Sequence, residues 1–230
     1  MSHEGEDRAL DLVYAARTPE GLASAYQAWS PTYDHETISL GYCLPFVIGG
    51  WIARYVPKGT GPILDVGCGT GLAAPWLQAL GYPEIHGMDF SPAMLNLAEA
   101  RGAYARLTRA TLGEPLPWAD HTFAAAFATG VFTEGHAPAE SLDEIARIVH
   151  PGGHVVLTVR DSVLVKGGFG QVFERLQRER RWEPVEQSPS FRSFAISEPE
   201  VLVRTFVFSM CQGPPDGNSG RSAPQPWSHR

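Results

Sequence analysis

The sequence predicts an α/β fold in which helices flank a mostly parallel β-sheet. From residue 62 to residue 210, short apolar runs alternate with stretches of helical periodicity, a pattern typical of parallel strands joined by helical crossovers. The first apolar run ends in a glycine-rich turn, Gly67-Cys68-Gly69-Thr70-Gly71. A strand that leads through such a turn into a helix is suited to hold a ligand, because glycine has no Cβ and the first amides of the helix point outward.

Apolar runs and turn residues place the elements in chain order. The expected strands cover residues 62–66, 84–89, 104–108, 123–129, 154–159 and 201–210, with one more between 182 and 195. The expected helices cover residues 71–80, 92–101, 138–149 and 169–181. Gly81 and Gly102 are suited to end the first two helices, while Ser91 caps the second and Pro92 takes its first position.

Composition divides the chain into three parts. Residues 1–58 carry apolar side chains at helical spacing, as in Leu22, Tyr26 and Trp29, and we expect a helical segment there. Residues 59–211 contain the predicted sheet. Residues 212–230 are rich in Gly, Pro and Ser, and such a segment buries too little apolar surface to offset its ordering entropy, so we expect a disordered tail.

The overall composition favours one soluble enzyme domain. The chain has 230 residues, 43% of them hydrophobic, and a formal net charge of −7, which argues against a nucleic-acid surface. Its three cysteines, Cys43, Cys68 and Cys211, are scattered and show no zinc-type spacing, so we expect neither disulfides nor a metal site. A polar, acidic start and the lack of a long apolar run predict no signal peptide and no membrane span. We expect a cytoplasmic monomer, with a nuclear location left open.

The glycine turn and the next strand tip narrow the class of ligand. A dinucleotide site uses G-x-G-x-x-G, but Leu72 follows the third glycine here, and no Gly-Lys-Ser/Thr of a phosphate loop is present. These features disfavour a nicotinamide dehydrogenase. Asp89 stands at the end of the second predicted strand. A carboxylate there can accept two charge-assisted hydrogen bonds from a vicinal diol, such as the hydroxyls of a ribose.

Taken together, residues 63–71 and 87–95 resemble the first motif and the following acidic strand tip of class I S-adenosylmethionine-dependent methyltransferases. Residues 25–34, read with these motifs, are similar to the methyltransferase-like proteins of the Williams–Beuren deletion region, and the resemblance covers roughly residues 10–160. It implies S-adenosylmethionine as cofactor and a Rossmann-like sheet of seven strands in the order 3-2-1-4-5-7-6, the last one antiparallel. It also implies that the N-terminal helices form a lid over the cofactor.

The resemblance assigns residues to the cofactor site. Asp89 would bind the ribose, the glycine turn would lie against the methionyl part with Cys68 presenting its backbone, and Thr129-Gly130 would pass beneath it. The full predicted set is Asp65, Gly67, Cys68, Gly69, Gly71, Asp89, Phe90, Met94, Thr111, Leu112, Thr129, Gly130, Tyr26 and Tyr33. For Asp65 and Met94 a purely structural role is an equal alternative. Tyr26 and Tyr33 are either core residues or an aromatic mouth that attracts the positive sulfonium.

Methyl transfer needs a general base only when the nucleophile arrives protonated. The candidates are His136 and Tyr33, with Asp34 and His35 beside the latter. Two positions depart from the family pattern: no acid stands in Ala110-Thr111-Leu112, where the adenine edge is usually bound, and Ala124 replaces a common aspartate. We expect a small-molecule acceptor first and a protein second. The alternative is a catalytically silent module that binds S-adenosylmethionine or S-adenosylhomocysteine as a partner subunit.

Overall fold

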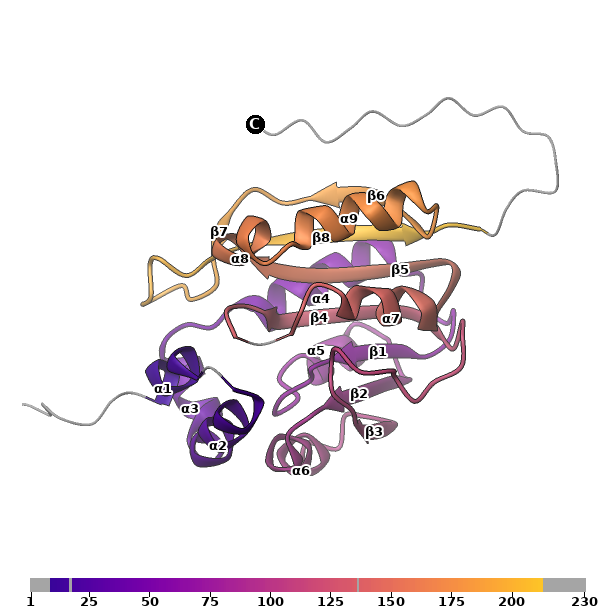
Figure 1. Ribbon diagram of the computed structural model, residues 1–230. Coiled ribbons are helices and arrows are strands. Elements are labelled where there is room, and N and C mark those ends of the chain that lie inside the picture. Colours follow the sequence, from indigo (N-terminus) through magenta and orange to yellow (C-terminus); the bar gives the residue numbers. More distant parts are fainter. Residues whose placement is uncertain (1–8, 17, 136, 213–230) are drawn as a thin grey trace, which may run out of the picture.

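The computed structural model describes residues 9–16, 18–135 and 137–212, and its centre is one twisted β-sheet (Figure 1). The strands are β1 (Ile63–Val66), β2 (Ile85–Asp89), β3 (Arg106–Arg109), β4 (Phe123–Phe132), β5 (Val149–Arg160), β6 (Trp182–Gln187), β7 (Phe191–Arg192) and β8 (Leu202–Met210). The first five pair in parallel, while β8 runs antiparallel to β5, β6 and β7. The main path has the order β3-β2-β1-β4-β5-β8-β6, with the short β7 beside β8. The predicted strand order is therefore confirmed.

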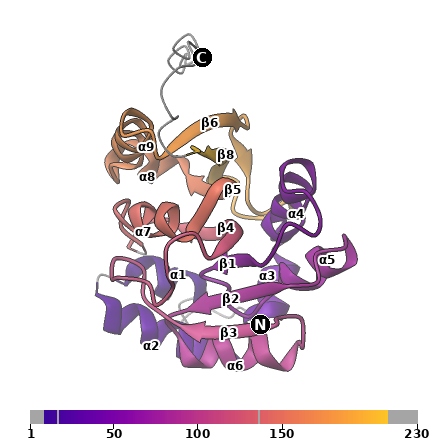
Figure 2. The ribbon, with the colours of Figure 1, turned by 90° about the vertical axis from the view of Figure 1, so that its right-hand side faces the viewer.

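Helices cover both faces of the sheet. They are α1 (Ala9–Ala15), α2 (Pro19–Trp29), α3 (Tyr33–Ser39), α4 (Leu44–Tyr55), α5 (Ala74–Ala79), α6 (Pro92–Ala100), α7 (Ser141–Ile148), α8 (Asp161–Lys166) and α9 (Phe169–Arg178). Figure 2 shows α7, α8 and α9 on one side of the sheet and α4 and α5 on the other. Alternate strand residues supply the two cores, since Leu64 packs with the first group and Ile63 with the second.

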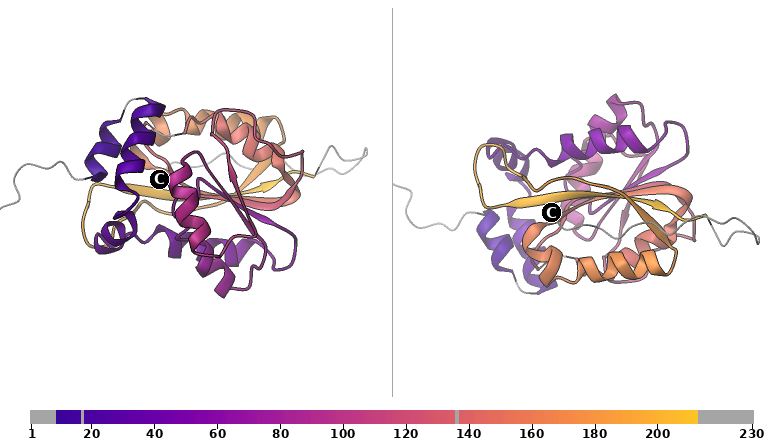
Figure 3. Two further views of the ribbon diagram at one scale, coloured as in Figure 1. Left: turned by 90° about the horizontal axis from the view of Figure 1, so that it is seen from below. Right: turned by 90° about the horizontal axis from the view of Figure 1, so that it is seen from above.

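The N-terminal segment divides into two parts. Helices α1 to α3 gather at one end of the sheet (Figure 3) and share a separate apolar cluster that contains Leu10, Val13 and Trp29. Helix α4 belongs instead to the sheet layer, because Ile48 and Ile52 are fully buried against strand residues. Only α1 to α3 are thus placed as a lid. The boundary at residue 58 stays a prediction, and the expected tail, apart from Gln212, lies outside the described residues.

Several element boundaries differ from the sequence prediction for backbone reasons. The helix expected from residue 71 begins at Ala74, because Gly71 has a φ of +84° that a right-handed helix does not allow. The helix expected to reach residue 181 ends at Arg178, and Arg180 adopts a φ of +57°. Strand β5 starts five residues early, at Val149 rather than at residue 154, and thus includes the Pro151-Gly152-Gly153 turn.

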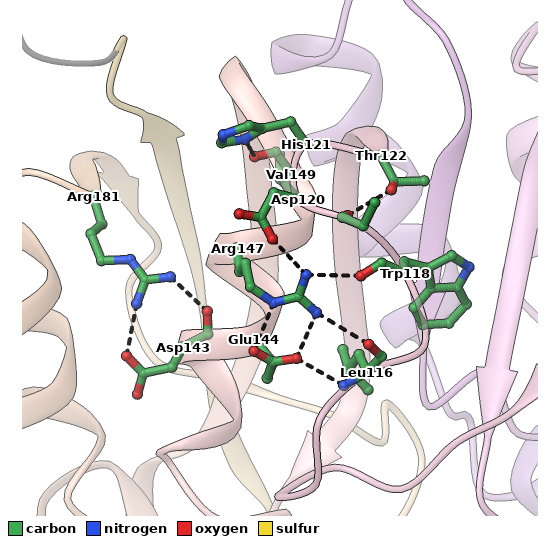
Figure 4. A network of polar contacts seen from close by, with 11 residues as sticks. Leu116, Trp118, Asp120, His121, Thr122, Asp143, Glu144, Arg147, Val149 and Arg181 are labelled. Carbon is green, nitrogen blue, oxygen red and sulfur yellow. Dashed lines mark hydrogen bonds and ion pairs between the residues drawn. The ribbon is translucent and has the colours of Figure 1, made fainter.

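An arginine-centred network holds the opposite end of the sheet, where β4 and β5 begin (Figure 4). The Arg147 guanidinium donates to the carboxylates of Glu144 and Asp120. It also donates to the carbonyls of Leu116 and Trp118, at 3.1 and 2.8 Å. The network fixes the loop that leads into β4. In the described part of the chain, no helix is long and apolar enough to cross a bilayer.

Candidate functional site

The carboxyl ends of β2 and β4 border a cavity of about 270 Å³ that α2 and α3 cover. Ligand sites in open α/β sheets lie at this end of the strands. The predicted site residues that line the cavity are Tyr26, Tyr33, Gly67, Gly69, Asp89, Phe90, Met94, Thr111, Leu112, Thr129 and Gly130. Residues scattered over more than 100 positions of the chain therefore meet around one space.

The remaining predicted residues are placed differently. Asp65 and Cys68 line a smaller cavity of about 40 Å³ on the other side of the glycine turn. Gly71 lines neither cavity, and a Cβ there would lie 2.8 Å from the Tyr104 ring and 3.3 Å from Ala98, so close packing against α6 explains this glycine. His136 lies outside the described residues, although its neighbours Gly135 and Ala137 line the large cavity.

Backbone conformation accounts for the other two glycines of the turn. Gly67 and Gly69 have φ values of +70° and +55°, which side chains with a Cβ rarely adopt. A Cβ on Gly67 would lie 2.5 Å from a methyl group of Val131, whereas one on Gly69 would meet no neighbour within 4 Å. The turn therefore keeps open the space that it borders.

Asp89 joins the second strand to the glycine turn. Its carboxylate accepts hydrogen bonds of 2.9 Å from the amides of Gly69 and Ser91, one on each oxygen. Burial raises the pKa of Asp89, and the hydrogen bonds from Ser91 and Gly69 oppose that shift. Each oxygen keeps a further lone pair on the cavity side, as binding of two ribose hydroxyls requires.

Asp65 is fully buried between the small cavity and Tyr104. The Tyr104 hydroxyl donates to Oδ2 of Asp65 at 2.7 Å. Burial raises the pKa of Asp65 to about 7, the Tyr104 hydrogen bond opposes this, and the negative charge of Asp89 adds to it. The two roles left open by the sequence are therefore compatible, because one oxygen holds Tyr104 while the side chain lines a cavity.

Cys68 contributes less of its backbone than the sequence suggested. Its amide donates to the Met88 carbonyl at 2.8 Å, and its carbonyl accepts from the Gly71 amide at 2.9 Å. Both groups thus stabilise the turn itself. Burial, together with the nearby Asp65 and Asp89 charges, raises the pKa of the Cys68 thiol well above its ordinary range. A neutral thiol is a poor nucleophile, so Cys68 acts here as a small buried side chain.

Thr129 has an unsatisfied polar atom at the junction of the two cavities. Among the described residues, no partner bonds its buried hydroxyl, and Thr129 lines both spaces. A buried polar group without a partner is uncommon and points to a missing ligand or water. The next residue, Gly130, donates its amide to the Thr158 hydroxyl at 2.9 Å, which fixes the strand end beside the cavity.

Aromatic side chains from the lid form the mouth of the large cavity. The Tyr26 ring meets Phe90 edge-on with centroids 6.2 Å apart, and the Trp29 ring meets Tyr33 at 4.6 Å. Tyr26 and Tyr33 are also packed against the lid's apolar cluster, so they are core residues and cavity wall at once. Of the two candidate bases beside Tyr33, Asp34 is bonded to Thr70 and Arg101, and His35 is exposed and lines none of the described cavities.

Comparison with known proteins agrees with this geometry. The family described as a methyltransferase domain matches residues 64–157. Human methyltransferase-like protein 27 is 35% identical over 198 residues, which cover 76% of this chain and 79% of that protein. The chain belongs to the class I S-adenosylmethionine-dependent methyltransferases.

Two further relatives of this methyltransferase bear on acceptor and fold. A ubiquinone biosynthesis O-methyltransferase of Alkalilimnicola ehrlichii is 34% identical and covers 69% of the chain and 64% of that enzyme. A Haloferax volcanii putative methyltransferase, solved in complex with the Trm112 methyltransferase activator, superposes with a TM-score of 0.63 at 18% identity. That alignment covers 81% of this chain and 98% of the other, and it supports the fold.

The cofactor of this methyltransferase is S-adenosylmethionine, and the residues present fit it. The Gly67 cradle, the paired acceptors of Asp89 and the unpartnered Thr129 hydroxyl all border the large cavity. Sequence reasoning missed Tyr42 and Tyr104, which line or support the site. Tyr42 follows a lid helix without a motif of its own, and Tyr104 precedes a weak edge strand. Neither carried a local signal.

Proposed function

We propose that this methyltransferase acts on a small-molecule acceptor. The observation that carries the proposal is the character of the lid-covered cavity, whose walls include Leu22, Tyr26, Met88, Met94 and Val131. Mostly apolar walls with a few placed polar groups are typical of small-molecule sites. A side chain on a folded protein would have to pass α2 and α3 to enter this space.

Relatives with printed acceptors support a small molecule. The Alkalilimnicola enzyme is named for ubiquinone biosynthesis, and a Bacillus licheniformis enzyme, 32% identical over 165 residues, is named for demethylmenaquinone. Both names indicate apolar quinone compounds as the context of methylation. The same chemical character suits the aromatic mouth of the cavity, so the proposal extends to an apolar acceptor.

The chain's own residues have two tasks in such a reaction. Bound S-adenosylmethionine supplies a methyl group on a positively charged sulfur. Asp89 and Thr129 would hold and orient the cofactor, while α2 and α3 exclude water from the reacting atoms. Tyr33 lines both cavities, and His136 follows Gly135 on the large one. These two residues stay our candidates for accepting a proton from the acceptor.

Transfer of a labelled methyl group tests the proposal. The protein is incubated with methyl-labelled S-adenosylmethionine and a cell extract, which is then separated by ultrafiltration into small molecules and macromolecules. We expect label in the small-molecule fraction with the native protein and a large loss with Asp89→Ala. Label confined to protein would refute the small-molecule acceptor, and no transfer at all would favour a silent binding module.

We also propose that the protein acts as a cytoplasmic monomer. Cys43, Cys68 and Cys211 are unpaired, which is usual for proteins of reducing compartments. A fluorescent fusion and analytical ultracentrifugation test location and assembly directly. An exclusively nuclear signal or a dimer at micromolar concentration would contradict the respective part of this proposal.

A further inference from the structure

A third cavity lies behind the lid, next to the cofactor cavity. It has a volume of about 60 Å³ and is bordered by α1 to α3, by the ends of β4 and β5, and by residues 193–203. Tyr33 and Tyr42 line this cavity as well as the two others. Gly130 lies between the large cavity and the third one, with the Tyr42 hydroxyl directly against its α-carbon. The third cavity therefore meets the cofactor site at one point.

Backbone hydrogen bonds hold the wall formed by Tyr42 in place. The Cys43 amide donates to the Ser193 carbonyl at 3.0 Å, and the Ala195 amide donates to the Gly41 carbonyl at 2.8 Å. The rings of Tyr42 and Phe194 then face each other with centroids 5.3 Å apart. The lid and the segment before β8 thus form one continuous wall around the cavity.

The wall is mainly apolar. Five aromatic residues contribute to it: Tyr26, Trp29, Tyr33, Tyr42 and Phe194. The Trp29 indole N–H already donates to Glu36 at 2.8 Å, and the Thr37 hydroxyl donates to the Tyr33 carbonyl at 2.7 Å. These polar groups are satisfied within the protein, which leaves ring faces and aliphatic groups to contact a ligand.

The charge of the wall is compensated. Of the described residues that line the third cavity, Arg160 is the only one with a formal charge. Its guanidinium donates to Glu134 at 2.8 Å, and its side chain is 17% exposed. An anionic ligand would have to compete with Glu134 for this arginine. A cationic ligand would find no carboxylate among the described lining residues, and burying an unpaired charge is costly.

We propose that the third cavity is the acceptor subsite and that it receives an uncharged apolar ring. This inference rests on the proposed small-molecule function and names the class of acceptor. Tyr33 and Tyr42 stand where the ring would approach the cofactor cavity. A cavity of about 150 Å³ is needed to hold a benzene ring, so the third cavity, at about 60 Å³, accepts a ring when the side chains of α1 and α2 move aside.

Binding of three matched probes tests the subsite without turnover. The probes are 2-naphthol, 2-naphthoate and 2-naphthylmethylammonium, which share a ring and differ in charge. Each is titrated into the full-length protein saturated with S-adenosylhomocysteine, and binding is followed by calorimetry. We expect 2-naphthol to bind at least about tenfold more tightly than either charged probe. Equal or tighter binding of a charged probe would overturn the proposal.

A cavity-filling variant ties the binding to this place. Val201 is 6% exposed and lines the third cavity but not the two others. Val201→Phe should weaken 2-naphthol binding by about tenfold or more and leave S-adenosylhomocysteine affinity within about twofold. The control Val165→Phe, at a position 82% exposed on α8, should change neither affinity. Unchanged 2-naphthol binding in Val201→Phe would refute the location.

A second variant covers the case in which Val201→Phe fails to fold, which loss of S-adenosylhomocysteine binding would reveal. Val201→Ala enlarges the same cavity and should increase the affinity for a three-ring probe, 2-anthrol, relative to 2-naphthol; an unchanged ratio would contradict the subsite. Failure of the proposed function is a separate result. It would appear as no label in small molecules while 2-naphthol binding stays sensitive to residue 201.

Discussion

The carboxylate of Asp34 accepts a hydrogen bond of 2.6 Å from the hydroxyl of Thr70, which ties α3 of the lid to the glycine turn. The second oxygen of Asp34 pairs with Arg101, and Arg101 also donates to the Thr70 carbonyl. Thr70 is 1% exposed, so this contact is shielded from water. Lid, glycine turn and the end of α6 therefore share one set of polar contacts, and the position of the lid is coupled to the cofactor site.

Thr70→Val should loosen the lid while keeping the shape of the turn. The variant removes the hydroxyl donor and leaves one oxygen of Asp34 with less compensation, at a cost of about 1 kcal/mol. Amide hydrogen exchange in α3 should become severalfold faster, and S-adenosylmethionine should dissociate faster. The control is Thr60→Val, since Thr60 is exposed and bonds only the nearby Pro57 carbonyl. Equal exchange rates in the two variants would argue against the coupling.

Asp89→Ala should weaken S-adenosylmethionine binding by about 2 kcal/mol or more, or about 30-fold, because two charge-assisted hydrogen bonds to the ribose are lost. The Gly69 amide also loses its acceptor, so the turn contributes to the loss. Titration calorimetry measures the affinity. Asp120→Ala, at an exposed carboxylate that pairs with Arg147 at the far end of the sheet, is the control and should leave the affinity unchanged. An affinity retained in Asp89→Ala would refute the ribose assignment.

The buried Asp65 should make the ligand-free protein less stable as pH rises. An unfolded Asp ionises near pH 3.8, whereas burial raises the pKa of Asp65 in the folded protein to about 7. Between these values the folded state binds more protons than the unfolded state, so the free energy of unfolding falls with pH and levels off above about pH 7. Asp65→Asn should remove this contribution, on the order of 3 kcal/mol between pH 4 and pH 8.

Denaturant unfolding at several pH values measures this contribution, and Tyr104 provides its control. The Tyr104 hydrogen bond lowers the pKa of Asp65, so Tyr104→Phe should extend the decline in stability to higher pH. A native protein and an Asp65→Asn variant with parallel pH profiles would show that Asp65 is ionised in the folded state throughout this range.

The Arg147 network should contribute to stability and not to cofactor binding. Arg147→Met keeps much of the side-chain volume but leaves Glu144 and Asp120 without their partner and two carbonyls without a donor. We expect a loss of about 2 to 3 kcal/mol in the free energy of unfolding. Arg178→Met is the matched control, because Arg178 is exposed and bonds only the Glu174 carbonyl at 3.4 Å. A changed S-adenosylmethionine affinity in a folded Arg147→Met protein would contradict this separation.

The parts of the site that the sequence predicted are those with short-range signals. The glycine turn and Asp89 each follow a strand directly, so their place at the carboxyl edge results from local pattern and the parallel order of the sheet. Tyr42 and Asp34 could not be found this way. Their roles depend on how the lid packs onto Gly130 and Thr70, contacts that no periodicity encodes.

Boundaries show the same limit on a smaller scale. Apolar spacing predicted the helices after β1 and β8's neighbour β6, but left-handed residues decided their ends: Gly71 delays α5, and Arg180 follows the end of α9. A non-glycine residue with positive φ is uncommon, and the sequence around Arg180 does not announce it. Helix α4 was grouped with the lid because its spacing matches a lid helix as well as a helix that packs on a sheet.

Gly130→Ala should damage the site through Tyr42. The position has a φ of +71°, and a Cβ would overlap the Tyr42 hydroxyl. We expect a loss of about 2 to 3 kcal/mol in stability, and a fall in methyl transfer of up to about 100-fold as Tyr42 is displaced beside the reacting atoms. Gly168→Ala is the matched control, since Gly168 has a φ of +77° with no neighbour within 4 Å and should lose only about 1 kcal/mol.

A double variant separates backbone strain from the overlap with Tyr42. In a Tyr42→Phe background the hydroxyl is absent, and the nearest remaining ring carbon lies 3.5 Å from the added Cβ, an ordinary contact distance. Gly130→Ala should then cost no more than Gly168→Ala, which gives a coupling free energy of about 1 to 2 kcal/mol between positions 42 and 130. Additive effects of the two substitutions would mean that Tyr42 does not rest on Gly130 in solution, and Tyr42 would lose its place between the cofactor cavity and the third cavity.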